Sequence, residues 1–300
     1  MAPSLAPRLI RVAVIALASS ALVGASSGQP AAPEIGPTAA VAQPAAAVDP
    51  GPPPAPPSSA ERMRVRDGLA AAASNDWAGL AQLRDGARDP LVRRLLHWRL
   101  ATSAEAPLSF TDLARALSEL DGWPGRADMR ARAEQAIFAS DLSASERIAF
   151  LRSDGGPQSG DGQIALALAL RQAGQRSEAN DVARAAWREA VLTSAAETRA
   201  LEEFGAALTA EDHAARVDAL LWRNQRSAAQ RLSSRLSPAD RTVLNARVAM
   251  QSRQSRGLQA AVDAVPASRA EHPGFMFDRV QYRRRTGNPE EALPLAVRVD

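Results

Sequence analysis

Helical periodicity over most of the chain is the feature that most restricts its fold. From about Ala60 to Asp300, apolar residues recur at helical spacing, and the breaks between these stretches are short. This spacing predicts a string of about fourteen or fifteen α-helices of roughly 10 to 16 residues, joined by tight turns. Alanine, leucine and arginine dominate, and aromatic residues make up only 4% of the chain. The composition therefore favours an all-α fold over a β-sandwich or a doubly wound sheet.

Three helix starts are marked by a capping residue followed by proline. In sequence order they are Asp89-Pro90, Ser237-Pro238 and Asn288-Pro289. The capping side chain accepts a hydrogen bond from a free amide of the first turn, and proline at the first helical position has no amide to satisfy. An acidic residue such as Asp240 in the first turn suits the positive end of the helix. We therefore expect helices to begin at these three prolines.

The helix expected from Pro90 carries one apolar face. Leu91, Leu95 and Trp98 share it, and Leu96 lies one position off. The arginines of the same helix are better placed to reach solvent. Such a stripe buries one side of a helix against its neighbours, which is the pattern of layered helical hairpins.

A weak internal sequence repeat supports a hairpin array. Residues 174–179 and 287–292 share the pattern G-x-x-x-E-A, which suits the turn between two helices of a tetratricopeptide-like hairpin. Their separation of 113 residues is not a clean multiple of 34, the tetratricopeptide period. We therefore predict an α-solenoid, or superhelix, of stacked and degenerate tetratricopeptide-like hairpins, in which each unit depends on its neighbours.

The first 25 residues have the layout of a signal peptide. Arg8 and Arg11 precede an apolar run over residues 12–24, and small residues at 23–25 suit a signal peptidase. The run is too short to span a bilayer comfortably, and no second apolar stretch of about 18 residues follows. We expect a periplasmic protein with no transmembrane segment after cleavage; retention of the run as an uncleaved anchor is the less favoured alternative.

Residues 26–59 differ in composition from the helical part. They are rich in proline, alanine, glycine and serine, and they end in the run GPPPAPPSS. Such a segment cannot bury enough apolar surface to offset the entropy of ordering it. We expect a disordered linker over residues 26–59 that leads into a helical scaffold domain over residues 60–300.

Charge and cysteine content exclude several functions. The chain has no cysteine, which excludes disulfides, zinc–thiolate sites, iron–sulfur clusters and thiol nucleophiles. All 36 basic residues are arginine, and they face 33 acidic residues. Without the two arginines of the signal peptide the formal net charge is +1, from 34 basic and 33 acidic residues. This balance is far from the concentrated positive field that nucleic-acid binding requires, so we expect no nucleic-acid partner.

The histidines and acidic pairs do not suggest a site. His97, His213 and His272 are widely separated and lack the spacing of metal ligands. We expect His213 to be partly buried or exposed. Adjacent acidic residues occur at 202–203, 211–212 and 290–291. Neighbours on a helix point in different directions, so the capping of helix ends explains these pairs better than shared catalysis.

Two further motif classes are also unfavoured. The glycine-rich segment 153–162 follows no predicted strand, and the chain has no lysine, so we interpret it as a loop between helices and not as a phosphate site. No G-x-S-x-G motif of a serine nucleophile is present. We therefore expect no catalytic, cofactor-binding or metal-binding residue in this chain, and no cofactor.

Arginine clusters are the one candidate for ligand binding, because the planar guanidinium grips carboxylates well. They are Arg62, Arg64 and Arg66; Arg93, Arg94 and Arg99; and Arg283 to Arg285. The favoured alternative is that they form solvated helix faces in a chain without lysine.

The five tryptophans are spread at about one per helix pair. They are Trp77, Trp98, Trp123, Trp187 and Trp222. We expect most of them to anchor turns or the core between helices and not to act as platforms for stacking sugars.

Several segments together resemble a known family. In order they are 89–100, 121–137, 159–190, 208–223 and 275–293. As a set they resemble the N-terminal superhelical region of soluble lytic murein transglycosylases, and the match runs from about residue 76 to the end. The turn at Trp123-Pro124 with the helix containing Glu134, and the helix from Asp212 to Trp222, are its more specific parts.

The resemblance implies a periplasmic protein whose helices coil into a U or ring. In that family a lysozyme-like domain follows and cleaves the β-1,4 bond between N-acetylmuramic acid and N-acetylglucosamine without water, forming a 1,6-anhydro product. One glutamate acts there as general acid and then base. None of that site can be carried over to this chain. The family's catalytic glutamate precedes a serine, and no glutamate here does; the only tyrosine, Tyr282, lies between Gln281 and Arg283.

The helix expected from Pro289 is still running at Asp300, without a terminal glycine or a polar tail, so we expect the scaffold to be truncated there. The leading hypothesis is a lytic transglycosylase whose scaffold, inactive by itself, positions peptidoglycan glycan strands or periplasmic protein partners. The alternative is a complete tetratricopeptide-like adaptor without catalytic activity. A glycosidase that uses carboxylates already present is the least favoured hypothesis.

Overall fold

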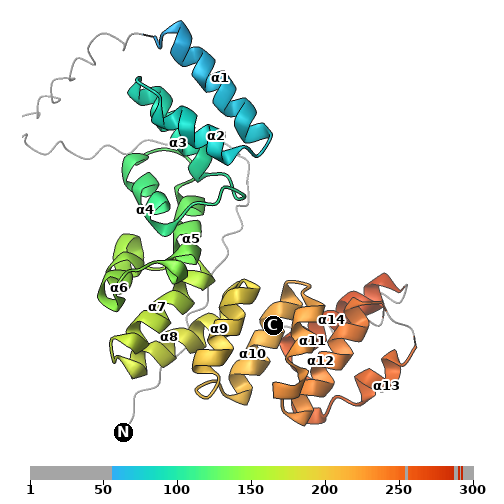
Figure 1. Ribbon diagram of the computed structural model, residues 1–300. Helices are drawn as coiled ribbons and strands as arrows, with labels where there is room; N and C mark the ends of the chain where they lie inside the picture. The colour runs from blue at the N-terminus through green and yellow to red at the C-terminus, as the bar shows by residue number, and fades with distance from the viewer. Residues whose placement is uncertain (1–55, 254–255, 287–289, 291, 293–300) are drawn as a thin grey trace, which may run out of the picture. The chain divides into compact units, whose positions relative to one another are not determined.

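The computed structural model describes residues 56–253, 256–286, 290 and 292. In this part of the chain the secondary structure consists of fourteen α-helices and four short 3-10 helices, without a strand (Figure 1). The predicted all-α fold of stacked helical hairpins is confirmed. The predicted signal peptide and residues 26–55 of the predicted linker lie outside the described residues. The first helix begins at Ser59, one residue before the predicted boundary.

The helices follow one another with short connections. The first seven are α1 (Ser59–Ala73), α2 (Trp77–Asp85), α3 (Pro90–Ala101), α4 (Phe110–Glu119), α5 (Arg126–Ala136), α6 (Ala144–Arg152) and α7 (Gly160–Gln172). The other seven are α8 (Arg176–Glu189), α9 (Ser194–Phe204), α10 (Ala210–Trp222), α11 (Arg226–Arg231), α12 (Pro238–Gln251), α13 (Leu258–Asp263) and α14 (Pro273–Arg285). The 3-10 helices are η1 (Ile137–Ala139), η2 (Ser153–Gly155), η3 (Ser233–Arg235) and η4 (Ala267–Arg269).

Each helix packs mainly on helices close to it in sequence. The helices α1, α2 and α3 pack on one another, α3 contacts α4, and α4 packs on α5. Helix α7 packs on α5, α6, α8 and α9, and α10 packs on α8, α11 and α12. Helices α13 and α14 both pack on α12. This near-neighbour packing is the arrangement of a solenoid, in which every unit contacts only the units beside it.

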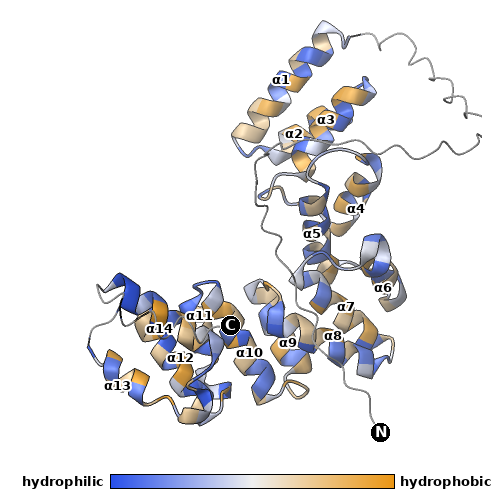
Figure 2. Cartoon of the chain, turned by 180° about the vertical axis from the view of Figure 1, so that it is seen from behind, coloured by the Kyte–Doolittle hydropathy of each residue, from blue (hydrophilic) through white to orange (hydrophobic). Residues whose placement is uncertain are grey.

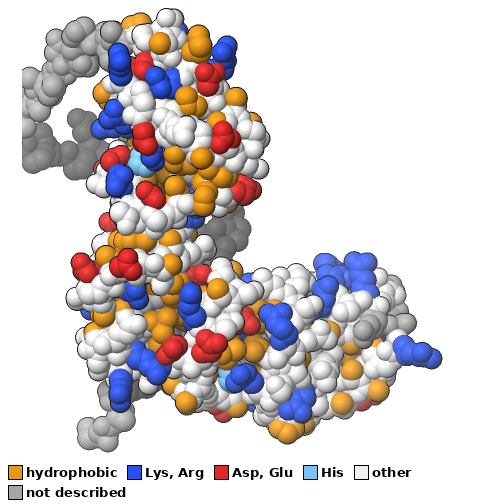
Figure 3. All heavy atoms as spheres, in the orientation of Figure 1, with side chains coloured by type: hydrophobic (Ala, Val, Ile, Leu, Met, Phe, Trp, Pro, Cys, Tyr) orange, Lys and Arg blue, Asp and Glu red, His pale blue; other side chains and the backbone are white. Residues whose placement is uncertain are grey.

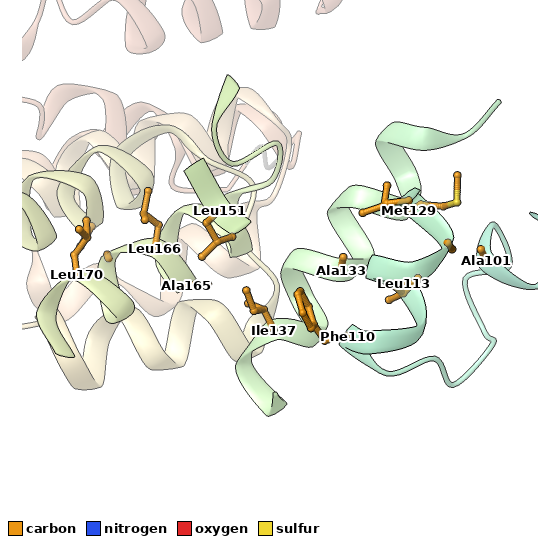
Figure 4. Close-up of a cluster of buried hydrophobic side chains, with 14 of the residues drawn as sticks. Ala101, Phe110, Leu113, Met129, Ala133, Ile137, Leu151, Ala165, Leu166 and Leu170 are labelled. Carbon is orange, nitrogen blue, oxygen red and sulfur yellow. The ribbon is translucent and has the colours of Figure 1, made fainter. Parts of the chain in front are cut away.

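Buried apolar residues form a chain of clusters and not one central core. Most helices carry both hydrophobic and hydrophilic residues (Figure 2). Figure 4 shows one cluster, where Leu113, Met129, Ile137 and Leu151 project from neighbouring helices into the space between them. A second cluster joins α7 to α12, a third joins α1 to α3, and a fourth joins α12 to α14.

Two predicted helix starts are confirmed, and the third lies outside the described residues. Asp89 accepts hydrogen bonds from the amides of Leu91 and Val92 at 2.8 and 3.2 Å, and helix α3 begins at Pro90. Ser237 accepts a hydrogen bond from the amide of Asp240 at 3.2 Å, and helix α12 begins at Pro238. These starts were predictable because a cap is a contact between residues close in sequence.

The buried face of α3 is not the one expected. Val92, Leu96 and Leu100 are its buried apolar residues, whereas Leu91 is 57% exposed and Leu95 is only partly buried. The prediction is therefore wrong for Leu91. Leu96, which was placed one position off the predicted face, is fully buried, and Leu95 and Trp98 are partly buried, so the buried face is shifted by one position. The helix carries two adjacent apolar stripes, and the packing of α1 and α2 on α3 decides which one is buried.

Helices α6 to α8 and α9 to α11 form an internal repeat with a period of 50 residues. Their starts at Ala144, Gly160 and Arg176 correspond to Ser194, Ala210 and Arg226. We call α6 to α8 the first repeat and α9 to α11 the second repeat. Both hairpins turn through a left-handed residue, Gly174 with φ of 82° and Asn224 with φ of 58°.

After each of these turns the chain closes the helix end in the same way. The amide of Gln175 donates to the carbonyl of Leu170 at 2.9 Å, and the amide of Gln225 donates to that of Leu220 at 2.9 Å. This is the bond of a Schellman motif, which satisfies a carbonyl that the helix end leaves free. The predicted hairpin turn at residues 174–179 is thus confirmed. The second predicted turn, at 287–292, falls largely outside the described residues.

Candidate functional site

A polar pocket of about 390 Å³ opens between the three helices of the second repeat. We call it the α9–α11 pocket. Helices α9 and α10 each contribute to it, and so do the turn after α10 and helix α11. The residues that matter below are Glu197, Arg216, Asn224, Arg226, Ala228 and Arg231.

Local capping fixes the helices that carry the pocket. Thr193 caps α9, accepting from the amide of Ala196 at 3.2 Å, and its own amide donates to Asp161 of α7 at 2.9 Å. Thr209 and Asp212 form a capping box at the start of α10. The left-handed residue Asn224 then places the turn and α11 against α10. The pocket is therefore built on helix ends that are each held by hydrogen bonds.

Arg216 forms the buried floor of the pocket. Its side chain is 1% exposed, and it donates to the carbonyl of Ala190 at 2.6 Å and to Glu197 at 3.1 Å. Its guanidinium carbon lies 5.3 Å from the ring centre of Trp187. Burial lowers the pKa of Arg216, and the hydrogen bond to Glu197 opposes that change. Since the ordinary pKa of arginine is far above neutrality, Arg216 carries its charge there.

Glu197 lies between two arginines. One carboxylate oxygen accepts the hydrogen bond from Arg216, and the other lies 3.6 Å from Arg231, whose side chain is 61% exposed. Arg226 also lines the pocket, and within the described part of the chain it has no hydrogen bond or ion pair. Three guanidinium groups thus face one carboxylate. The pocket has a formal net charge of +2 and suits an anionic group.

Other buried charges hold neighbouring helices together. Glu134 is fully buried and accepts hydrogen bonds from Arg130 at 3.0 Å and from the amides of Gln158 and Ser159, each at 2.8 Å. These amides belong to the glycine-rich segment 153–162. Only residues 156–159 form the predicted loop, because 153–155 are η2 and 160–162 begin α7. Two of its amides therefore bind a carboxylate of the same chain.

Asp212 makes a second link of this kind. Its carboxylate accepts hydrogen bonds from Arg184 at 2.9 Å, from Arg188, and from the amide of Thr209 at 2.8 Å. Burial favours a higher pKa, but these hydrogen bonds outweigh it and lower the pKa of Asp212 to about 2. The capping interpretation of the pair at 211–212 is confirmed for Asp212.

The other acidic pairs behave differently. The capping interpretation is wrong for Glu202 and Glu203, because both lie in the last turn of α9, where the helix dipole disfavours negative charge. Glu203 instead lies 3.2 Å from Arg171 of α7. In the third pair Glu290 is exposed, and Glu291 lies outside the described residues. A charge pattern alone did not distinguish these cases.

The histidines serve the packing of separate helices. His97 is 4% exposed, and its Nδ1 lies 3.0 Å from Glu119. His213 is 5% exposed and packs edge-on against Trp187, with ring centres 5.5 Å apart, so the prediction of a partly buried or exposed ring is wrong. His272 caps α14. Burial lowers the pKa of all three imidazoles. Over the described ranges, histidine and acidic side chains form no group able to hold a metal ion.

The arginine clusters named from the sequence lie on other helices. Arg62, Arg64 and Arg66 lie on α1, Arg93, Arg94 and Arg99 on α3, and Arg283 to Arg285 on α14. None of them lines the α9–α11 pocket. Figure 3 shows basic side chains interspersed with acidic ones over most of the visible face. Sequence reasoning missed Arg216, Arg226 and Arg231, because they are not neighbours in sequence. The shared Gln-Arg-Ser at 175–177 and 225–227 was the signal that marks this hairpin.

Four of the five tryptophans pack between helices or at turns, as predicted. Trp187 is fully buried, and Trp98 lies 6.2 Å from Trp123 between ring centres. Trp77 is partly buried against the cluster of α1 to α3. Trp222 is the exception, since it is 46% exposed. Its ring centre lies 4.7 Å from that of Phe277, which is 37% exposed.

Within the described ranges, no helix has the length and apolar character needed to cross a membrane. No family model matches this sequence, and the comparison with curated proteins found no match.

Proposed function

We propose that the described helices form the scaffold of an exported lytic transglycosylase that acts on peptidoglycan. In this proposal the scaffold positions glycan strands or periplasmic protein partners. Bond cleavage itself is assigned to a lysozyme-like domain encoded beyond Asp300. The proposal starts from the resemblance of five ordered segments to the superhelical region of that family.

The observation that carries the proposal concerns the two most specific of those segments. Residues 121–137 contain Glu134, and residues 208–223 contain Asp212. Each carboxylate is fully buried and joins its own helix to a neighbouring segment. Each of these two segments therefore contributes a buried carboxylate that links neighbouring parts of the helical array. This is what a scaffold requires, because its function depends on the relative placement of its helices.

Co-sedimentation with purified peptidoglycan tests the proposal. The chain from residue 26 to Asp300, without the predicted signal peptide, is expected to co-sediment with the polymer and to release no 1,6-anhydro muropeptides. The coding sequence after codon 300 is expected to contain a Glu-Ser-aromatic motif, and a chain extended through that motif is expected to release these products. A stop codon directly after Asp300, or anhydro products from the chain that ends at Asp300, would contradict the proposal.

The exposed pair of Trp222 and Phe277 favours a second candidate, a periplasmic adaptor for protein partners. Exposed aromatic residues in contact with each other are common at the centres of protein interfaces. If the adaptor hypothesis holds, Trp222→Ala is expected to reduce cross-linking to periplasmic proteins, and the native chain is expected not to sediment with peptidoglycan. Sedimentation that Trp222→Ala leaves unchanged would favour the first proposal.

A further inference from the structure

The internal repeat shows which residues of the α9–α11 pocket the fold itself requires. Arg216 of the second repeat corresponds to Leu166 of the first, 50 residues earlier. Leu166 is 7% exposed and belongs to a buried apolar cluster. A leucine therefore satisfies the packing at this position in a hairpin with the same turn and the same helix starts. The hairpin does not require a buried arginine there.

A buried arginine is costly where an apolar side chain is sufficient. Removing a guanidinium from water costs several kcal/mol, and its ion pair often does no more than offset that cost. Arg216 pairs with Glu197, but its Nε is buried and has no hydrogen-bond partner among the described residues. The arginine therefore adds little to the stability of the hairpin. Its contribution is a fixed positive charge at the floor of a pocket.

A second difference between the repeats removes one acidic side chain from the α11 side of the pocket. Glu178 follows the turn in the first repeat and pairs with Arg152 of α6. The corresponding residue of the second repeat is Ala228, which lines the α9–α11 pocket. Arg226 precedes it by two residues and has no ion pair in the described part of the chain. The second repeat thus lacks the carboxylate that this position supplies in the first.

We propose that the α9–α11 pocket binds a small ligand with two carboxylates, such as a short acidic peptide. A volume of about 390 Å³ lies within the range of small-molecule sites. The formal charge of +2 matches a dianion. Arg226 is partly buried and Arg231 is exposed, and the guanidinium group of each has the planar fork that fits a carboxylate. Asn224 also lines the pocket, and its side-chain amide can both donate to and accept from a peptide group. The inference goes beyond the proposed function and holds independently of it.

Calorimetric titration of the full chain with N-acetyl-L-glutamate tests the proposal, because this probe has two carboxylates and one amide. N-acetyl-L-glutamine, which lacks one carboxylate, is expected to bind at least about tenfold more weakly. Inorganic phosphate tests whether the pocket prefers a phosphate to a dicarboxylate, and we expect phosphate to bind more weakly. Absence of binding by N-acetyl-L-glutamate, or tighter binding of phosphate, would overturn the proposal.

Substitutions that remove the charge of Arg226 or Arg231 test whether the ligand binds in the α9–α11 pocket. Arg226→Gln and Arg231→Gln are each expected to weaken binding of N-acetyl-L-glutamate by roughly tenfold to a hundredfold. Arg176→Gln is the matched control. It removes the same charge from the corresponding position of the first repeat, where Arg176 is exposed. The control is expected to bind as the native chain does. Equal weakening by all three substitutions would show a general charge effect and overturn the assignment.

Ala228→Glu gives a second test, because it restores the acidic residue of the first repeat. The new carboxylate is expected to occupy the positive charge of the pocket and to reduce binding at least tenfold more than Ala228→Gln, which has the same size without charge. Thermal unfolding checks that both variants fold. If the two variants bind equally well, the carboxylate-binding role of the pocket is wrong.

Discussion

At the scale of single residues, the carboxylate of Glu134 joins three segments of the array. It lies on α5, accepts two amides of the loop before α7, and pairs with Arg130. Arg130 in turn donates to the carbonyl of Phe150 in α6 at 2.6 Å. Apart from the Arg130–Glu134 pair within one helix, these contacts connect residues 20 to 25 positions apart, so no local pattern predicts them. The sequence identified the helix around Glu134 but not the partners of its carboxylate.

Glu134→Gln is expected to lower the free energy of unfolding by about 3 kcal/mol, because it leaves the buried guanidinium of Arg130 without its nearest counter-charge. Urea denaturation measures the change. Glu119→Gln is the control, since Glu119 is 49% exposed in its contact with His97. It is expected to cost less than about 1 kcal/mol. Similar losses in the two variants would contradict the central role of Glu134.

Asp212 predicts a pH dependence of stability. Its pKa is about 2 in the folded chain, below the ordinary value of 3.8, so the unfolded chain binds the proton first as the pH falls. The stability that ionised Asp212 contributes is therefore complete above about pH 4 and is lost between about pH 4 and pH 2. The advantage of the native chain over Asp212→Asn in thermal unfolding should shrink across this window. A constant difference from pH 5 to pH 2 would contradict this assignment.

At the scale of elements, helix starts and turns were the most predictable features. Asp89 and Ser237 act through residues two or three positions away, and the turn at Gly174 depends on one left-handed residue. The buried face of α3 was not predictable in the same way. It depends on which of two apolar stripes meets α1 and α2. The arginines of the α9–α11 pocket were likewise not predictable from local sequence, because the hairpin brings them together.

The two equivalent turns give a matched test of backbone strain. Gly174 has φ of 82° with no atom within 4 Å of an added Cβ, so Gly174→Ala has only a conformational cost, about 1 kcal/mol. Asn224→Gly, at the corresponding position, is expected to change the free energy of unfolding by less than about 0.5 kcal/mol. Thermal and urea unfolding measure both. Unchanged stability in Gly174→Ala would show that the turn does not hold the hairpin.

At the scale of the whole molecule, composition and periodicity were sufficient to predict a helical array, but not its 50-residue repeat. The repeat keeps its caps and turns, such as Ser143 and Thr193 at the starts of α6 and α9. Its buried positions have diverged, as in Leu166 and Arg216. A repeat that shares its helix ends and little of its core leaves a weak trace in the sequence. The geometry of the turns made it visible.

Separate clusters along the array predict that a core mutation acts locally. Trp187 is fully buried in the cluster that joins α7 to α12, and Leu80 is fully buried in the cluster of α1 to α3. The two clusters share no residue. Trp187→Ala is expected to cost about 3 to 5 kcal/mol, and Leu80→Ala about 2 to 5 kcal/mol. In a nearest-neighbour array each loss is felt mainly by the adjoining helices.

Amide hydrogen exchange measures which helices lose stability in each variant. Trp187→Ala should increase exchange in α7 to α11 and leave α1 to α3 close to the native rate, and Leu80→Ala should give the reverse pattern. The two variants control for each other, because the helices expected to be destabilised in one variant are expected to stay native in the other. If both variants accelerate exchange to the same extent from α1 to α14, the helices unfold as one cooperative unit. Each hairpin would then depend on all the others and not only on its neighbours.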